Sequence, residues 1–196
     1  MSNKRNKKIF NITIVGLMTA IATIIYMVFP EVQIIPGVEY MKVDFSDFPA
    51  ILTGVIFGPV QGVLVEIFKN IIHLTRTTTV GIGEIMNIVI GSGMIISMST
   101  FVRIFKKVFK ETDLSLKTYA IASAITIIIS IIIGWVANIV FTPIYFTIMN
   151  IPLVTETYWA GVWGSTTLNS VKAIFNILPF FPIYFALEKG VKKYTM

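Results

Sequence analysis

The sequence KVDFSDFPAILTGVIFGPVQGVLVEIFKN, residues 42–70, contains two short apolar runs separated by Gly58-Pro59. Gly-Pro is a turn signal, and each run is shorter than the roughly 20 residues that an upright membrane helix needs. We therefore predict a helical hairpin, over about 47–57 and 60–74, that is buried in or tilted within a larger bundle.

The rest of the chain has the composition of an integral membrane protein. Of its 196 residues 55% are hydrophobic and 13% are charged, and the mean hydropathy is +0.82. A soluble domain needs more charge to cover its surface. Because no polar stretch is long enough to form a second unit, we expect one membrane domain over residues 1–196. The net charge of +6 is distributed as in membrane proteins and gives no reason to expect nucleic-acid binding.

Apolar segments at six places predict an all-α, six-helix transmembrane bundle. The first is longer than a signal-peptide core and precedes no small-x-small cleavage site, so it counts as a span. The segments lie at about 9–29, 47–57, 60–74, 84–107, 116–141 and 167–188.

Basic residues predict the orientation. They gather before the first span, between the fourth and fifth, and after the sixth, which places every cluster on one side. The positive-inside rule then predicts a multi-pass protein of the cell membrane with both termini in the cytoplasm. Residues 40–47, 74–84 and a long loop at 142–167 would lie outside.

Several polar residues occur where lipid-facing residues are expected. Asn169, Lys172 and Asn176 are spaced i, i+3, i+7 and share one helical face. A charged side chain at membrane depth costs about 2.5–3.5 kcal/mol or more, and it usually faces a cavity or a partner. Lys172 alone is also consistent with a side chain that extends to the interface.

Two further helices carry polar side chains toward the same outer end. Asn138 ends a small and polar stripe in the fifth span, a pattern that also suits close helix packing. Glu84 and Asn87 share a face of the fourth span, where Glu84 is alternatively a carboxylate favoured by the helix dipole. Outer aromatic residues would complete a pocket for a flat heterocycle: Tyr40, Trp135, Tyr145, Tyr158, Trp159 and Trp163.

Other polar residues suit structural roles. Glu66 and Lys69, at i, i+3, form a self-satisfying pair. Cysteine is absent and His73 is the only histidine, so we expect no disulfide, thiol chemistry or metal site. In the first span Gly16 and Ala20 form a small-xxx-small pair that permits close approach of another helix, in this protein or in another.

With these motifs the chain resembles the S components of energy-coupling factor (ECF) vitamin transporters, and among them those specific for riboflavin. The resemblance covers Lys42 to Asn176 and rests on the 42–70 segment, on GIGEIMNIVIGS at 81–92 and on LNSVKAIFN at 168–176. It implies a six-helix subunit without its own ATPase that binds riboflavin as its transported ligand and uses no cofactor. It further implies docking on a transmembrane T component that carries two ATP-binding cassette subunits.

The resemblance also implies residue roles. The Asn-x-x-Lys of the sixth helix corresponds to Asn169 and Lys172, and Asn138 is a looser match on the fifth. Ligand contacts from the first outer loop would be Tyr40 and Met41. The family's T-component contact, usually alanine-rich, would be Gly16 and Ala20.

The charged start of the hairpin suits a lid that closes over the ligand. Lys42 pairing with Asp44 or Asp47 would form its hinge, with Asp44 or Ser46 capping the second helix and Pro49 in its first turn. A structural role of these carboxylates is favoured over ligand contact.

Three other functions differ from this one in what they require of the chain. An S component for another heterocycle, such as a pterin or a pyrimidine, differs only in pocket shape. A membrane enzyme could use Asp44 and Asp47 to hold Mg²⁺. The sequence contains no further carboxylate cluster and no nucleophile–base pair, so we do not expect an enzyme. A transporter that works without partner subunits would show internal repeats, and none is visible in the sequence. The sequence also has no G-x-x-x-x-G-K-[ST] motif, so ATP binding would require another subunit.

Overall fold

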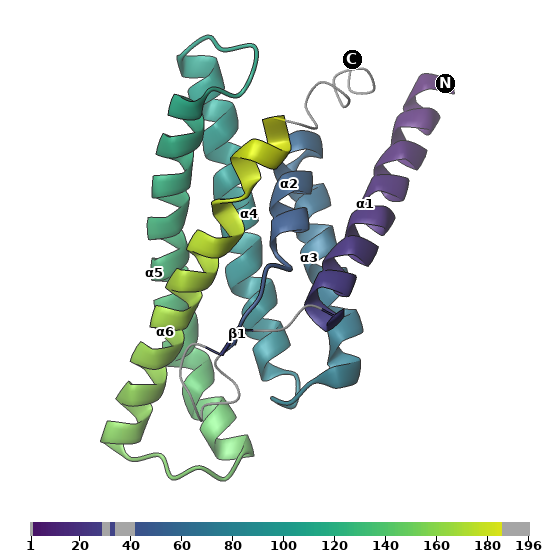
Figure 1. Ribbon diagram of the computed structural model, residues 1–196. Coiled ribbons are helices and arrows are strands. Elements are labelled where there is room, and N and C mark those ends of the chain that lie inside the picture. Colours follow the sequence, from purple (N-terminus) through teal and green to yellow (C-terminus); the bar gives the residue numbers. More distant parts are fainter. Residues whose placement is uncertain (1, 29–31, 34–41, 186–196) are drawn as a thin grey trace.

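A computed structural model of the chain describes residues 2–28, 32–33 and 42–185. It is an all-α bundle, in which α1, α2 and α3 lie on one side and α4, α5 and α6 on the other (Figure 1). The helices are α1 Ser2–Val28, α2 Phe48–Phe57, α3 Pro59–His73, α4 Ile82–Val108, α5 Leu116–Ile148 and α6 Thr155–Ile177. The predicted six-helix fold is confirmed.

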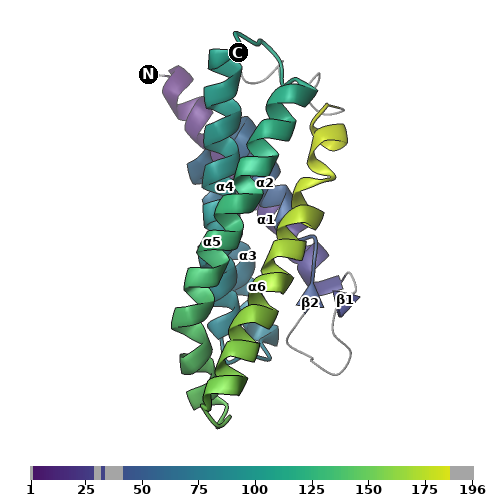
Figure 2. The same cartoon turned by 90° about the vertical axis from the view of Figure 1, so that its left-hand side faces the viewer.

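Three short elements are new relative to the sequence prediction. The two-residue strands β1 (Val32–Gln33) and β2 (Lys42–Val43) pair antiparallel, and Figure 2 shows them beside α6. A single 3-10 turn, η1 (Leu74–Arg76), follows α3.

The predicted hairpin is formed by α2 and α3. Their 10 and 15 residues correspond to lengths of about 15 Å and about 22 Å, shorter than the hydrocarbon core of about 30 Å. Gly58 joins them at φ 135°, a conformation that residues with a Cβ rarely adopt. Pro49 and Pro59 lie in the first turns of α2 and α3.

Glycine lets the two hairpin helices cross closely. A Cβ on Gly62 would lie 2.6 Å from the Ala50 carbonyl oxygen and 2.8 Å from the Cα of Gly54. Around this crossing α2 is the most enclosed helix of the bundle, with Ala50 and Ile51 fully buried. Helix α2 therefore lies at the centre of the core, whereas α3 also exposes an apolar face with Val60, Phe68 and Ile71.

Four helical segments are long and apolar enough to cross a membrane. They are Asn6–Val28, Ile82–Val108, Leu116–Ile148 and Thr155–Phe185. The last of them continues α6 beyond a turn at residues 178–179. With the α2–α3 hairpin between them, these segments give a multi-pass membrane protein.

The long loop predicted at 142–167 is wrong. Helix α5 continues to Ile148 and α6 begins at Thr155, so that only 149–154 connect them. Helix α5 continues through Pro143, although proline cannot donate to the carbonyl four residues earlier. In the structure the Tyr158 hydroxyl of α6 donates to that carbonyl, Ile139 O, at 3.3 Å.

Candidate functional site

A cavity lies among the helix ends that are remote from the start of α1. It is bordered by the last turns of α1 and α3, the first half of α4, the second half of α5 and the middle of α6. The structure brings five of the predicted contact residues to its wall: Glu84, Asn87, Asn138, Asn169 and Lys172.

Two asparagines present open hydrogen-bonding groups to this cavity. Asn138 is fully buried, and its Nδ2 donates to Thr166 Oγ1 at 3.1 Å, whereas its Oδ1 has no partner among the described residues. Asn169 is half-buried beside Gly134, where a Cβ would lie 3.5 Å from the Asn169 Cβ. Gly134 of α5 thus faces Asn169 of α6, and an added methyl group there would make ordinary van der Waals contact.

Lys172 is held by three acceptors of the protein. Its Nζ lies 2.8 Å from Asn87 Oδ1, 3.0 Å from Asp44 Oδ2 and 3.3 Å from Asp47 Oδ2. An ammonium group has three N–H donors, so these contacts use all of them. The side chain is buried and does not extend to the interface.

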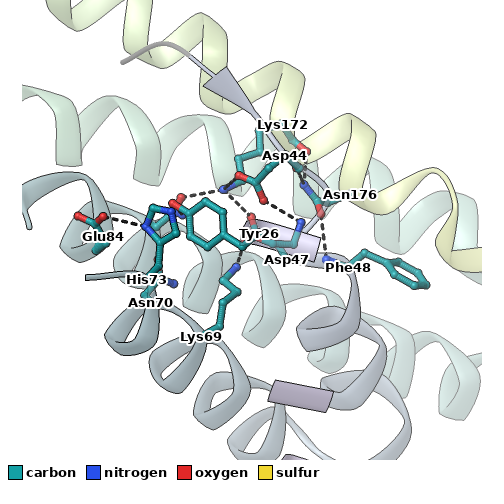
Figure 3. A network of polar contacts seen from close by, with 12 residues as sticks. Tyr26, Asp44, Asp47, Phe48, Lys69, Asn70, His73, Glu84, Lys172 and Asn176 are labelled. Carbon is teal, nitrogen blue, oxygen red and sulfur yellow. Dashed lines mark hydrogen bonds and ion pairs between the residues drawn. The ribbon is translucent and has the colours of Figure 1, made fainter. Parts of the chain in front are cut away.

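The carboxylates of the 44–47 segment belong to a buried charge cluster (Figure 3). Asp47 also pairs with Lys69, whose Nζ lies 2.8 Å from Glu66 Oε2. The predicted Glu66–Lys69 pair is therefore present, but it is one part of a larger network. Asp44 and Asp47 pair with Lys172 and Lys69. The side chain of Lys42, the predicted hinge partner, lies outside the described residues.

The environment of Asp44 favours its charged form. Burial works to raise the pKa of this carboxyl, but the ammonium groups of Lys172 and Lys69 outweigh it, and the pKa lies well below its ordinary value. A backbone hydrogen bond from Ser46 N to Asp44 Oδ1, at 2.7 Å, acts in the same direction. Asp44 therefore remains an anion facing the cavity.

The start of α2 is held by α6. Asp47 is the N-cap residue but makes no side-chain cap bond, so neither Asp44 nor Ser46 caps the helix as predicted. Instead Asn176 Oδ1 accepts from Phe48 N at 2.9 Å, and its Nδ2 donates to Asp44 O at 2.8 Å. Asn176, predicted to share the pocket face, fastens the charged segment to α6 and does not line the cavity.

Glu84 closes the turn between α3 and α4. Its Oε1 lies 2.9 Å from His73 Nδ1, and its Oε2 accepts from Thr77 at 2.9 Å and from Thr79 at 3.3 Å. Both oxygens are engaged, so this carboxylate shapes the cavity wall through hydrogen bonds within the protein.

The wall residues that sequence analysis missed include Tyr26 and His73. Their rings stack, with centroids 3.6 Å apart and planes 9° apart. Tyr26 lies seven residues after Thr19 and eleven after Val15, both buried, so this helical period was the available signal. Tyr26 also accepts a hydrogen bond from Asn87 Nδ2 at 3.1 Å.

The predicted aromatic wall is only partly present. Tyr145 and Phe146 of α5 line the cavity. Trp135, Trp159 and Trp163 are outside its lining and are 38%, 41% and 58% exposed. The predicted loop contacts Tyr40 and Met41 lie outside the described residues.

Gly16 and Ala20 of α1 are exposed, and a Cβ on Gly16 would meet no atom within 4 Å. The buried side of α1 is instead the one that carries Val15, Thr19 and Ala22. The small-residue face is therefore not covered by any described helix of this chain.

Comparisons with known proteins agree with this architecture. Residues 10–184 match the family described as ECF transporter, substrate-specific component. The chain is 26% identical over 193 residues to the riboflavin transporter FmnP of Bacillus subtilis, covering 95% of this chain and 96% of that protein. It is also 26% identical to the riboflavin transporter RibU of Staphylococcus aureus over 194 residues, 98% of this chain and 96% of the relative.

A solved structure shares the fold. It is described as the S component of a bacterial ECF transporter, superposes with a TM-score of 0.71 at 21% identity, and the match covers 98% of this chain and 99% of the other. Since the family match extends over most of the chain, this protein belongs to the family of substrate-specific components of ECF transporters.

Proposed function

We propose that the protein is the substrate-binding S component of an ECF-type importer and that it binds riboflavin in the cavity described above. The observation that carries the proposal is the cavity wall shared by α4, α5 and α6, in which Asn138 and Asn169 present open amide groups. The names of the full-length relatives support riboflavin as the ligand.

The chemistry of the wall suits an uncharged ring with a polar edge. An amide offers both a donor and an acceptor, which matches the alternating carbonyl and N–H groups of a flavin. Tyr145 and Phe146 supply apolar surface next to these amides. The described cations of the wall are paired with carboxylates, so no charge on the ligand is required.

Delivery of the ligand would depend on other subunits. We infer docking on a T component through the exposed face of Gly16 and Ala20, with two ATPase subunits supplying energy. The small side chains of this face permit close approach of a partner helix.

We infer a cytoplasmic location for both termini. The basic residues Lys106, Lys107, Lys110 and Lys117 lie around the α4–α5 connection, and Figure 1 shows this connection at the same end as the start of α1. Because the chain has no cysteine, Lys110→Cys and Asn150→Cys give clean single-site reporters. In intact cells an impermeant maleimide should label only Asn150→Cys; the reverse pattern would invert the topology.

The ligand is tested by titrating the purified protein with riboflavin and following the quenching of flavin fluorescence. We expect tight, saturable binding, and a yellow colour wherever flavin co-purifies. Absence of binding, or preference for a pterin or a pyrimidine over riboflavin, would overturn the assignment. In proteoliposomes, concentrative uptake should require the partner subunits, and accumulation by this chain alone would contradict the S-component role.

A further inference from the structure

Tyr26 is a cavity residue of α1, whereas the open amides come from α5 and α6. It lies two residues before the end of α1 and is half-buried. Its ring lies against His73 of α3 and near Lys172 of α6 (Figure 3). It is thus the contribution of α1 to the wall.

The ring is fixed by its neighbours. It stacks on His73, which in turn is held by Glu84 through the 2.9 Å contact at Nδ1. The ammonium groups of Lys69 and Lys172 lie 5.6 Å and 5.9 Å from the ring centroid, within the range of cation–π attraction. A ring held in this way keeps its hydroxyl in one place.

The hydroxyl has a proton that the protein does not use. Tyr26 Oη accepts from Asn87 Nδ2, and Asn87 Oδ1 accepts from Lys172. A phenol both donates and accepts, and no described residue accepts the Tyr26 proton. Lys172, by contrast, has all three donors engaged. Of these three side chains, Tyr26 therefore has its hydroxyl hydrogen to spare, and Asn87 has the second hydrogen of its Nδ2.

An unpaired donor in a cavity is costly to desolvate unless the ligand supplies an acceptor. We propose that Tyr26 is a ligand contact that donates its phenolic hydrogen to an acceptor atom, a carbonyl oxygen or a ring nitrogen, of the bound heterocycle. This proposal rests on the proposed function and names a specificity determinant for it. The bound ligand must therefore carry a hydrogen-bond acceptor on the side that faces α1.

The first test is Tyr26→Phe, which removes the hydroxyl and keeps the ring on His73. We expect riboflavin affinity to fall about five- to fiftyfold, as when one buried acceptor loses its partner. The matched control is Tyr119→Phe, because the Tyr119 hydroxyl donates to Ile177 O at 2.6 Å outside the cavity. The control should lose thermal stability and keep wild-type affinity.

A structural role acting through Asn87 would also weaken binding, so a second measurement separates the two. The affinities of 2-thioriboflavin, 4-thioriboflavin and 5-deazariboflavin, each with one acceptor weakened or removed, are compared with that of riboflavin. In the wild type one analogue should bind several-fold more weakly than riboflavin, and in Tyr26→Phe this difference should disappear.

Three results would overturn the inference about Tyr26. Wild-type affinity in Tyr26→Phe overturns the inference, and so does a weakened variant that keeps the full analogue difference. The inference is also overturned if none of the analogues is penalised in the wild type. A wild-type protein that does not bind riboflavin refutes the proposed function itself, which is a separate result from a failure at Tyr26.

Discussion

Asn169 and Lys172 are one helical turn apart, yet their surroundings give them different tasks. Asn169 has no side-chain hydrogen bond to any described residue, so its amide is available to a ligand. Lys172 is bound by Asn87, Asp44 and Asp47. Because all its donors are occupied, Lys172 mainly positions these neighbours. It can bind a ligand only by giving up one of its present acceptors.

Asn169→Ala should therefore weaken riboflavin binding with little effect on stability. Loss of one hydrogen bond to a buried ligand costs about 1–3 kcal/mol, or roughly five- to a hundredfold in affinity. Fluorescence titration measures the change. The control is Thr167→Ala on the same helix, because Thr167 is exposed and bonds only to Trp163 O of its own helix. If Asn169→Ala and Thr167→Ala bind riboflavin with equal affinity, Asn169 does not contact the ligand.

Lys172→Met should instead lower both stability and affinity. It leaves Asp44 buried without its main cation, and breaking a buried pair from one side costs about 3–5 kcal/mol. We expect a clear fall in the thermal unfolding temperature in detergent. Adding Asp44→Asn should recover part of this fall, because it removes the unpaired charge. A single variant as stable as the wild type would show that the ion pairs contribute nothing.

At the scale of the helices, the sequence predicted those features that depend on residues close together in the chain. Pro49, Gly58 and Pro59 are backbone signals within the hairpin itself, and the hairpin is confirmed. The Ile139 carbonyl, which Pro143 leaves without its helical donor, accepts from Tyr158, nineteen residues later, and no local pattern indicates this bond. The Asn176 bonds to the start of α2 join residues 128 positions apart, so spacing placed Asn176 on a face without revealing its partner.

The close crossing of α2 and α3 predicts the effect of adding a methyl group. In Gly62→Ala the new Cβ would meet backbone atoms of Ala50 and Gly54 at under 3 Å, and backbone cannot move aside without shifting the helix. We expect a loss of about 1–3 kcal/mol in the free energy of unfolding.

Gly16→Ala is the matched change at an open position of α1. There alanine should be neutral or stabilising by about 0.5–1 kcal/mol, since it is the better helix former. Thermal unfolding of both variants in detergent gives the comparison. A Gly62→Ala protein as stable as Gly16→Ala would mean that the hairpin helices do not approach this closely.

At the scale of the molecule, α1 links the two activities proposed here. Its inner side carries Tyr26 to the cavity, and its outer side exposes Gly16 and Ala20. Ligand binding and partner docking thus involve different sides of one helix, and they should be separable by substitution.

Gly16→Trp and Ala20→Trp should abolish docking on the T component and leave riboflavin affinity unchanged. Each adds a large side chain to a face where close approach needs small ones, and neither touches the cavity. Ile21→Trp is the control, because Ile21 is exposed on α1 but lies about 100° around the helix from Ala20. Co-purification with the tagged partner subunits measures docking, and fluorescence titration measures binding. If both small-residue variants retained the partners as well as Ile21→Trp does, the T component would have to dock on another face of the bundle.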